Sequence, residues 1–292
     1  MKHHIILFFI LTTMPIFTHA QTDRFIPFER IENGRDLGGL VMQDGRRIKP
    51  YRLVRSGNLS RASDADVAIL TERFALSNVY DFRFDAEVGG AQNRQIAGVS
   101  YTRLSTLPKA FIESFSSGRT DTTQIKSADV VDLLATYAFH PQAQEMARRL
   151  YPTIVMDTTS QRLYGDFLRG VLRAEGGVLW HCSQGKDRAG WATAFLLAAL
   201  GADRKTIVED FDLSNRFYAP VIEKLSARIA EKGGGEAEQD FIGAMVGVSV
   251  KNFESALDLI DQHYGSLANY LAEALNFSTD EQQRLRDKYL TQ

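Results

Sequence analysis

The chain has 292 residues, of which 44% are hydrophobic and 24% are charged, and its formal net charge at pH 7 is −2. This composition is ordinary for a folded globular protein, and it excludes a largely disordered chain. Because basic residues are not in excess, the overall charge gives no indication of nucleic-acid binding, and any attraction for anions must be local.

The first residues have the pattern of a secretory signal peptide. Lys2 provides a positive start, residues 5–17 are predominantly apolar, and Ala20 is a small residue of the kind found at cleavage sites. The apolar run is short compared with the ~20 residues that a helix needs to cross a bilayer, which makes a membrane anchor the less favoured interpretation. We therefore expect residues 1–20 to be removed and residues 21–292 to form one exported domain, periplasmic or secreted, without a transmembrane segment.

Short strands and turns are predicted from residue 24 to about residue 105. Residues 33–39 read Asn-Gly-Arg-Asp-Leu-Gly-Gly, which is typical of a glycine-rich loop. Ser63 is a suitable N-cap for a helix that runs to residue 74, because its hydroxyl can accept a hydrogen bond from an unpaired helical amide. Apolar runs predict strands at residues 51–55, 79–84 and 99–104.

Helices dominate the rest of the chain. Residues 106–126 are largely polar and loop-like, Ser127 is expected to cap a helix over 128–139, and Pro141 is expected to begin a helix that reaches about residue 150. Further helices are predicted from apolar spacing at residues 160–173, 205–217, 220–231, 250–263, 266–275 and 279–290, with a flexible glycine joint at 233–235.

One strand and one helix enclose a loop of special interest. Residues 177–180 form a short apolar strand, and residues 190–200 form an apolar helix that Gly201 ends. Strands that alternate with helices, followed by a helical tail, predict an α/β fold in layers. The intervening loop reads His181-Cys182-Ser183-Gln184-Gly185-Lys186-Asp187-Arg188.

The spacing of a cysteine, five residues and an arginine predicts an anion site. A loop that leads into a helix N-terminus directs several backbone amides at one place, where an anion can bind. Gly185 would let the backbone approach the ligand without an intervening side chain. Arg188 offers a planar fork that can hold two phosphate oxygens.

Cys182 is the one cysteine of the chain, which rules out an internal disulfide. Because Cys182 faces the same loop amides, helix N-terminus and arginine, the thiolate form of its side chain is favoured. A thiolate beneath a bound phosphate is placed for in-line attack on phosphorus. The product would be a cysteinyl-phosphate that water hydrolyses, without a metal or cofactor. The alternative is a buried structural cysteine in a helix-capping turn.

This loop resembles that of bacterial tyrosine-phosphatase-like proteins, described as triple-specificity or atypical lipid phosphatases, which share the pattern His-Cys-x-x-Gly-Lys-Asp-Arg. The resemblance implies a phosphatase fold, in which a mostly parallel sheet is flanked by helices and the loop follows a strand. It implies activity on phosphotyrosine, phosphoserine, phosphothreonine or phosphoinositides. Supporting segments are residues 33–39, 55–60, 81–83, Glu87, 212–215, 264–266 and 270–271.

The resemblance also implies roles for individual residues. Ser183, Gln184 and Gly185 would line the phosphate site. Lys186 would add a second positive charge for multiply phosphorylated lipid headgroups, its alternative role being a solvated surface charge. Residues 127–150 are our candidate for a helical lid over the pocket.

The leaving group of such a reaction needs a proton donor, for which a carboxylic acid is usual. The resemblance favours Asp187, whose alternative role is to accept hydrogen bonds from loop amides. Asp81 is a second candidate, although an ion pair with Arg35 or Arg83 is the more plausible role for it. His181 is expected to orient the loop rather than to act as a base.

Ala189 departs from the resembled pattern, in which the residue after the arginine is usually threonine. A hydroxyl there would stabilise the sulfur as it leaves in the second step. We therefore expect slower hydrolysis of the cysteinyl-phosphate, unless another donor such as Ser183 serves. Two other classes of function remain open: a weakly catalytic phosphate- or phosphoinositide-binding module, and redox or sulfur-transfer chemistry. Arsenate reduction on such a loop normally needs further cysteines, which the chain lacks, and a rhodanese-like loop would not need Lys186 and Asp187 before the arginine.

Overall fold

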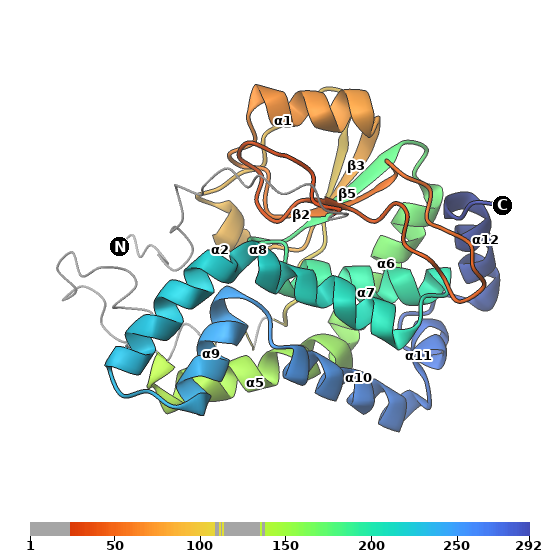
Figure 1. Cartoon of the computed structure of the whole chain (residues 1–292). Helices are drawn as coiled ribbons and strands as arrows, with labels where there is room; N and C mark the ends of the chain where they lie inside the picture. The colour runs from red at the N-terminus through yellow and green to blue at the C-terminus, as the bar shows by residue number, and fades with distance from the viewer. Residues whose placement is uncertain (1–23, 109–110, 112, 114–134, 136–137) are drawn as a thin grey trace.

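The computed structural model describes residues 24–108, 111, 113, 135 and 138–292 (Figure 1). The expected signal peptide, residues 1–20, lies outside the described residues, as does the first part of the lid candidate at 127–150, including most of the helix expected over 128–139. Those features stay predictions.

A five-stranded sheet forms the centre of the described chain, in the order β1-β2-β5-β3-β4. β1 pairs antiparallel with β2, and the other pairs are parallel. This arrangement confirms the predicted α/β fold with a mostly parallel sheet. The strands span Arg35–Asp36 (β1), Leu53–Ser56 (β2), Leu76–Asp81 (β3), Ser100–Arg103 (β4) and Gly177–His181 (β5). β1 lies within the segment that we expected to be only a loop.

Three of the parallel strands end beside one another. Ser56 at the end of β2 pairs with His181 at the end of β5, and Asp81 at the end of β3 pairs with the same histidine. All of β5 is buried, as expected for a central strand that is covered on both faces. The loop after β5 therefore emerges at the carboxyl edge of the sheet, where α/β proteins commonly bind ligands.

One face of the sheet is covered by α1 (Asp64–Ala68), which continues as the π-helical segment η1 (Ile69–Arg73) (Figure 1). Ser63 caps α1 as predicted, because its hydroxyl oxygen accepts a hydrogen bond from the backbone N–H of Asp66. The apolar side chains buried between these helical turns and the strands include Val54, Leu70, Phe74, Val79 and Leu179.

The opposite face carries the larger core, beneath α6 (Thr158–Arg173), α7 (Asp187–Leu200) and α12 (Thr279–Tyr289) (Figure 1). Almost all of α7 is buried, and Gly201 ends it with a left-handed conformation, as predicted. Trp180 and Trp191 are fully buried in this core.

Two helices predicted over residues 205–217 and 220–231 form a single helix, α8 (Arg204–Glu231), which contains Pro220. A proline within a helix removes one hydrogen bond and costs ~3 kcal/mol. Burial of Tyr218, Leu225 and Ile229 on both sides of the proline offsets that cost. The prediction of two helices was therefore wrong, because tertiary packing overrides the local preference.

α9 (Glu236–Val246) was not predicted from the sequence. It packs against α8 and against α5 (Pro141–Met156), which extends beyond the predicted end at residue 150. α10 (Val250–Tyr264) and α11 (Leu267–Glu273) complete the helical part and match the expected segments closely. In Figure 1, α5, α9 and α10 form a layer beyond α7 and α8, on the side away from the sheet.

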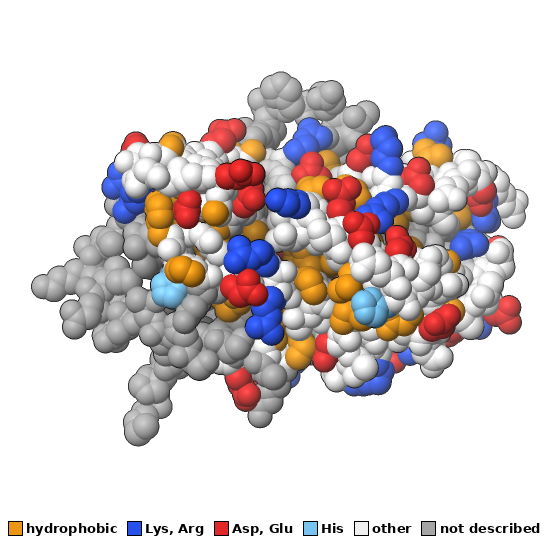
Figure 2. All heavy atoms as spheres, turned by 90° about the horizontal axis from the view of Figure 1, so that it is seen from below, with side chains coloured by type: hydrophobic (Ala, Val, Ile, Leu, Met, Phe, Trp, Pro, Cys, Tyr) orange, Lys and Arg blue, Asp and Glu red, His pale blue; other side chains and the backbone are white. Residues whose placement is uncertain are grey.

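The surface agrees with the low net charge. Acidic and basic side chains are interspersed across the face drawn in Figure 2, with hydrophobic side chains between them. In the described part of the chain, no helix combines the length and the apolar character needed to cross a membrane.

Candidate active site

The loop that connects β5 to α7 is fixed by hydrogen bonds to its carbonyl groups. The backbone N–H of Phe82 donates to the carbonyl of His181 at 2.9 Å, and Nδ1 of His181 is 3.0 Å from the carbonyl of Cys182. Because a carbonyl can only accept, Nδ1 carries the hydrogen. The carbonyl of Ser183 accepts from Asn58 twice, from its backbone N–H at 3.1 Å and from its side-chain amide at 2.9 Å.

The second half of the loop is held from beneath in the same way. The side-chain amide of Asn33 donates to the carbonyls of Gln184 at 3.3 Å and Gly185 at 3.1 Å. The guanidinium group of Arg55 donates to the carbonyls of Gly185 at 3.0 Å and Lys186 at 2.8 Å. Each carbonyl from His181 to Lys186 thus has a hydrogen-bond partner, which for Cys182 is the neighbouring His181 and for the others lies outside the loop.

These contacts set the direction of the loop amides. In a planar trans peptide, the N–H of the next residue points opposite to the carbonyl, so carbonyls drawn outward turn the amides inward. α7 begins at Asp187, and its N-terminus adds the positive end of a helix dipole at the same place. The loop therefore has the geometry of a backbone anion cradle.

Gly185 is required for a reason that the sequence did not indicate. Its φ is +69°, and a Cβ atom added there would lie 2.2 Å from the carbonyl oxygen of Ser56 and 2.5 Å from the nitrogen of Gly57. The missing side chain lets the loop pack directly against the end of β2. The expected room for a ligand at Gly185 stays a prediction.

Three arginines converge on one buried carboxylate beneath the loop. Oxygens of Asp210 lie 2.8 Å from Arg24, 2.9 Å from Arg55 and 3.6 Å from Arg35. Burial acts to raise the pKa of Asp210, but the three guanidinium groups lower it well below its ordinary value of 3.8. Because one negative charge faces three positive charges, this cluster leaves an excess of positive charge below the cradle.

Arg188 is held by a partner from another element. The short helix α2 (Asp85–Val88) follows β3 and carries Glu87, whose two carboxylate oxygens each lie 2.6 Å from a nitrogen of Arg188. Burial acts to raise the pKa of Glu87, but Arg188 outweighs it and leaves the pKa below its ordinary value of 4.5. The hydroxyl of Ser183 donates to the same carboxylate at 2.5 Å. Glu87 thus fixes the guanidinium fork and one wall of the loop together.

The side chain of Lys186 reaches the end of α9. Its ammonium group donates to the carbonyls of Ala244 at 3.1 Å, Met245 at 2.6 Å and Gly247 at 2.6 Å. The residue is 4% exposed, and burial lowers the pKa of its ammonium group, with the charge of Asp187 opposing the change. To contact a lipid headgroup, as we expected, Lys186 would have to exchange these carbonyls for the ligand.

The two candidate acids lie in different surroundings. Asp81 accepts hydrogen bonds from Arg83 and Asn93, the shortest at 2.7 Å, which agrees with the ion pair that we considered more plausible for it. Burial acts to raise the pKa of Asp81, but His181 and Arg83 leave it below its ordinary value. Asp187 has 18% of its side chain exposed and is the first residue of α7, directly after the loop. The choice between the two acids stays a prediction.

Comparison with known proteins decides the family. A model of the tyrosine phosphatase family matches residues 26–291. The chain belongs to this family. It is 30% identical over 291 residues to a Cupriavidus necator protein named "Putative tyrosine-protein phosphatase", an alignment that covers 96% of this chain and 94% of that protein. It is 26% identical over 252 residues to the triple specificity protein phosphatase PtpB of Mycobacterium tuberculosis, covering 80% and 89% of the two chains.

Membership makes this tyrosine phosphatase a phosphoric monoester hydrolase and confirms the family resemblance inferred from the loop. The predicted residues Cys182 to Lys186 form the loop at the carboxyl edge of the sheet, and Asp187 and Arg188 begin α7 directly after it. Cys182 is buried and 2% exposed, and Gln184 is half-buried.

Sequence reasoning missed most of the residues that support the loop between β5 and α7. Glu87, Asn33 and Arg55 were noted only as parts of resembling segments, and Asp210 carried no signal. Arg188 and Glu87 are 101 positions apart, and Asn33 and Gly185 are 152 apart. Only the fold brings these residues together.

Ala189 lies fully buried in the larger core, next to the loop. The hydroxyl of Ser183, which we considered as a substitute for the missing threonine, is already committed to Glu87. Ser183 would have to leave that contact to stabilise a departing sulfur. The expected slow second step therefore stays a prediction.

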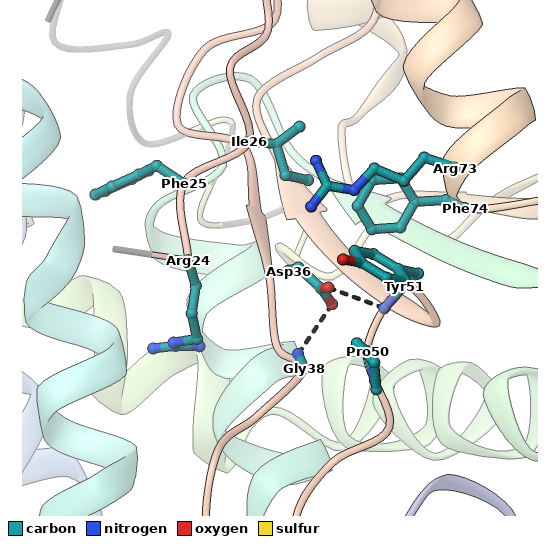
Figure 3. Close-up of a pocket in the computed structure, with 9 residues that line it drawn as sticks. All are labelled: Arg24, Phe25, Ile26, Asp36, Gly38, Pro50, Tyr51, Arg73 and Phe74. Carbon is teal, nitrogen blue, oxygen red and sulfur yellow. Dashed lines mark hydrogen bonds between the residues drawn. The ribbon is translucent and has the colours of Figure 1, made fainter. Parts of the chain in front are cut away.

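A separate pocket of about 230 Å³ opens beside β1 (Figure 3). Asp36 accepts hydrogen bonds there from the backbone N–H groups of Gly38 and Tyr51, both at 2.9 Å, and Arg73 lies over the ring of Tyr51. Neighbouring side chains of a strand project to opposite sides, so Asp36 faces this pocket whereas Arg35 faces the arginine cluster. The pocket is therefore distinct from the phosphatase loop.

Proposed function

We propose that this tyrosine phosphatase hydrolyses phosphomonoesters through a covalent cysteinyl-phosphate on Cys182. The observation that carries the proposal is the outward clamping of each loop carbonyl from His181 to Lys186, which turns the amides toward a common point. Arg188 lies at one end of that loop, with its fork oriented by Glu87. A phosphate bound there would receive amide and guanidinium hydrogen bonds together.

In the first step, the sulfur of Cys182 attacks phosphorus as the bond from phosphorus to the leaving oxygen breaks. Asp187 gives a proton to that oxygen, so the leaving group departs as a neutral alcohol or phenol. In the second step, water attacks phosphorus, the bond between phosphorus and sulfur breaks, and Asp187 takes a proton from the water. Asp81 is less suited to this role, because its carboxylate is already paired with Arg83 and Asn93.

The proposed substrates are phosphotyrosine, phosphoserine and phosphothreonine in proteins, and phosphoinositides. The name of the Mycobacterium tuberculosis relative supports more than one specificity. For phosphoinositides, Lys186 is the proposed contact for an additional phosphate, at the expense of its hydrogen bonds to the end of α9. We therefore expect lipid hydrolysis to be the more sensitive of the two activities to Lys186→Met.

The test is phosphate release by the mature protein from a phosphotyrosine peptide and from a panel of phosphoinositides, with Cys182→Ser as the matched variant. Release that vanishes in the variant supports the cysteine mechanism, and the preferred substrate ranks protein against lipid. Release that persists in Cys182→Ser would refute it. Binding of inorganic phosphate without release from any substrate would favour the alternative of a binding module.

We also propose that the mature protein is exported after removal of residues 1–20. The support is the sequence pattern, together with a family match that begins only at residue 26. Amino-terminal sequencing of protein recovered from the periplasm or the medium should begin near Gln21. Recovery only of the full-length chain from the cytoplasm would contradict export.

A further inference from the structure

A tyrosine from a distant helix contacts the proposed acid. The hydroxyl of Tyr151, on α5, donates a hydrogen bond to Oδ1 of Asp187 at 2.7 Å. The two residues are 36 positions apart, and Tyr151 is 2% exposed. A buried phenol that touches a reactive carboxyl group inside a catalytic loop needs a reason, because a phenylalanine would fill the same space without a polar group to satisfy.

The direction of the phenolic proton follows from the chemistry of its partner. A phenol has one hydrogen and a carboxylate oxygen accepts, so the phenolic hydrogen goes to Oδ1 of Asp187. Burial raises the pKa of Tyr151 well above its ordinary value, with the charge of Asp187 acting in the same direction, so the phenol remains a donor at physiological pH.

Aromatic packing keeps this phenol in place. The ring of Tyr151 meets those of Trp191, Phe211 and Phe253 edge-on, with centroid distances of 6.0, 5.7 and 6.5 Å. Edge-to-face contacts of this kind restrict the orientation of a ring. The packed ring therefore holds the hydroxyl group of Tyr151 in a fixed position beside Asp187.

We infer that Tyr151 is a positioning residue for Asp187, which leaves Oδ2 as the oxygen that holds the transferable proton. This inference rests on the proposed function, because it assumes that Asp187 serves as the acid. Oδ1 is occupied by the phenolic hydrogen, and a proton on that oxygen would clash with it. Oδ2 lies 3.5 Å from the ammonium group of Lys186, a longer contact than that of Oδ1 with the phenol, and this ammonium group donates to carbonyls at the end of α9. Oδ2 is therefore the oxygen less engaged by a donor and the one that can carry the proton.

The test compares two substrates that differ in their need for an acid. Phenyl phosphate releases a poor leaving group, whereas 2,4-dinitrophenyl phosphate releases one that is stable as an anion. We expect Tyr151→Phe to lower kcat/KM about 10-fold on phenyl phosphate, out of the ~100- to 10,000-fold that a positioned acid contributes. The same variant should lose less than about 3-fold on the dinitrophenyl ester. The ratio kcat/KM is used because it reports the first step even where hydrolysis of the intermediate limits turnover.

The matched control is Tyr289→Phe, which removes another buried phenol, one that donates to the carbonyl of Val171 at 2.8 Å. It should show the same small loss of thermal stability and no dependence on the leaving group. A second variant, Asp187→Asn, should share the selective loss on phenyl phosphate. Adding Tyr151→Phe to Asp187→Asn should then produce no further selective loss, because the two residues act through one carboxyl group.

The outcomes separate this inference from the proposed function. An equal loss on both esters, or none, in Tyr151→Phe would overturn the positioning role, as would full additivity with Asp187→Asn. Failure of the proposed function would be visible in the unmodified protein instead, as an absence of release that depends on Cys182. A Tyr151→Phe protein that melts far below Tyr289→Phe would assign the phenol a structural role and also overturn the inference.

Discussion

At the scale of single residues, the candidate site is organised by the buried pair between Arg188 and Glu87. Each is nearly inaccessible to solvent, and the two form a bidentate contact. Removing one member of a buried pair commonly costs ~3–5 kcal/mol, because the other charge is left without a partner. Glu87 therefore contributes to stability as well as to the orientation of the guanidinium fork.

This pair predicts a dependence of stability on pH. The pKa of Glu87 is lower in the folded protein than its ordinary value of 4.5, so the folded state binds fewer protons than the unfolded state. Its contribution is present above about pH 4.5 and is lost as the pH falls through the lower folded value. Urea unfolding should therefore show a large deficit for Glu87→Gln at pH ~7 and a smaller one at pH ~4.

The control for that measurement is Glu145→Gln, which alters an exposed pair with Arg148 and should change little at either pH. An equal deficit for Glu87→Gln at both pH values would show that the ionised carboxylate does not stabilise the fold.

A second prediction at this scale concerns Ala189. Ala189→Thr supplies the hydroxyl that the chain lacks, so we expect a few-fold rise in steady-state turnover and a smaller initial burst of leaving group. Because Ala189 is fully buried, the added atoms should also cost ~1–3 kcal/mol of stability. Ala194→Thr, at another buried position of α7, is the control for crowding alone. Unchanged burst and turnover would show that another group already serves the second step.

At the scale of elements, the loop depends on contacts from Asn33 before β1, from β2 and from α8 as much as on its own sequence. Arg55, in β2, donates to Gly185, Lys186 and Asp210 at once, with distances between 2.8 and 3.0 Å. The single ammonium group of a lysine cannot span three acceptors in this geometry. Arg55 is therefore the residue that links the sheet, the loop and α8.

We accordingly predict that Arg55→Lys weakens the binding of inorganic phosphate about 10-fold or more, because the loop amides lose their fixed direction. Isothermal titration at fixed ionic strength measures this directly. Arg52→Lys is the matched control, since Arg52 precedes the same strand and donates to one exposed carbonyl, that of Glu175. Unaltered phosphate affinity in Arg55→Lys would mean that the amides are aligned without this clamp.

At the scale of the whole molecule, short-range sequence patterns predicted the central strand β5, the loop that follows it and the helix α7. The apolar run at 177–180, the cysteine loop and the apolar helix ending at Gly201 are all encoded within about 25 successive residues, a length at which periodicity and capping are informative. The α/β fold followed from the alternation of such units.

What the sequence could not predict depends on long-range packing. α9 was missed because its sequence follows three glycines, begins with polar residues and contains Gly243, and it is held by burial of Phe241 and Ile242 against its neighbours. The hydrogen bonds of Lys186 were missed for the same reason, since the carbonyl groups that accept them lie at the end of α9. Glu87 and Tyr151 are ordinary residues in sequence and acquire their roles only from the fold.

The measurement that tests the central claim most directly is detection of the covalent intermediate. The mature protein is mixed with dinitrophenyl phosphate, quenched within milliseconds in acid, and digested for mass spectrometry. We predict a phosphate on the peptide that contains Cys182, more abundant in the parent chain than in Ala189→Thr and absent from Cys182→Ser. Rapid release of phosphate with no modified peptide, and undiminished release by Cys182→Ser, would contradict a cysteinyl-phosphate mechanism.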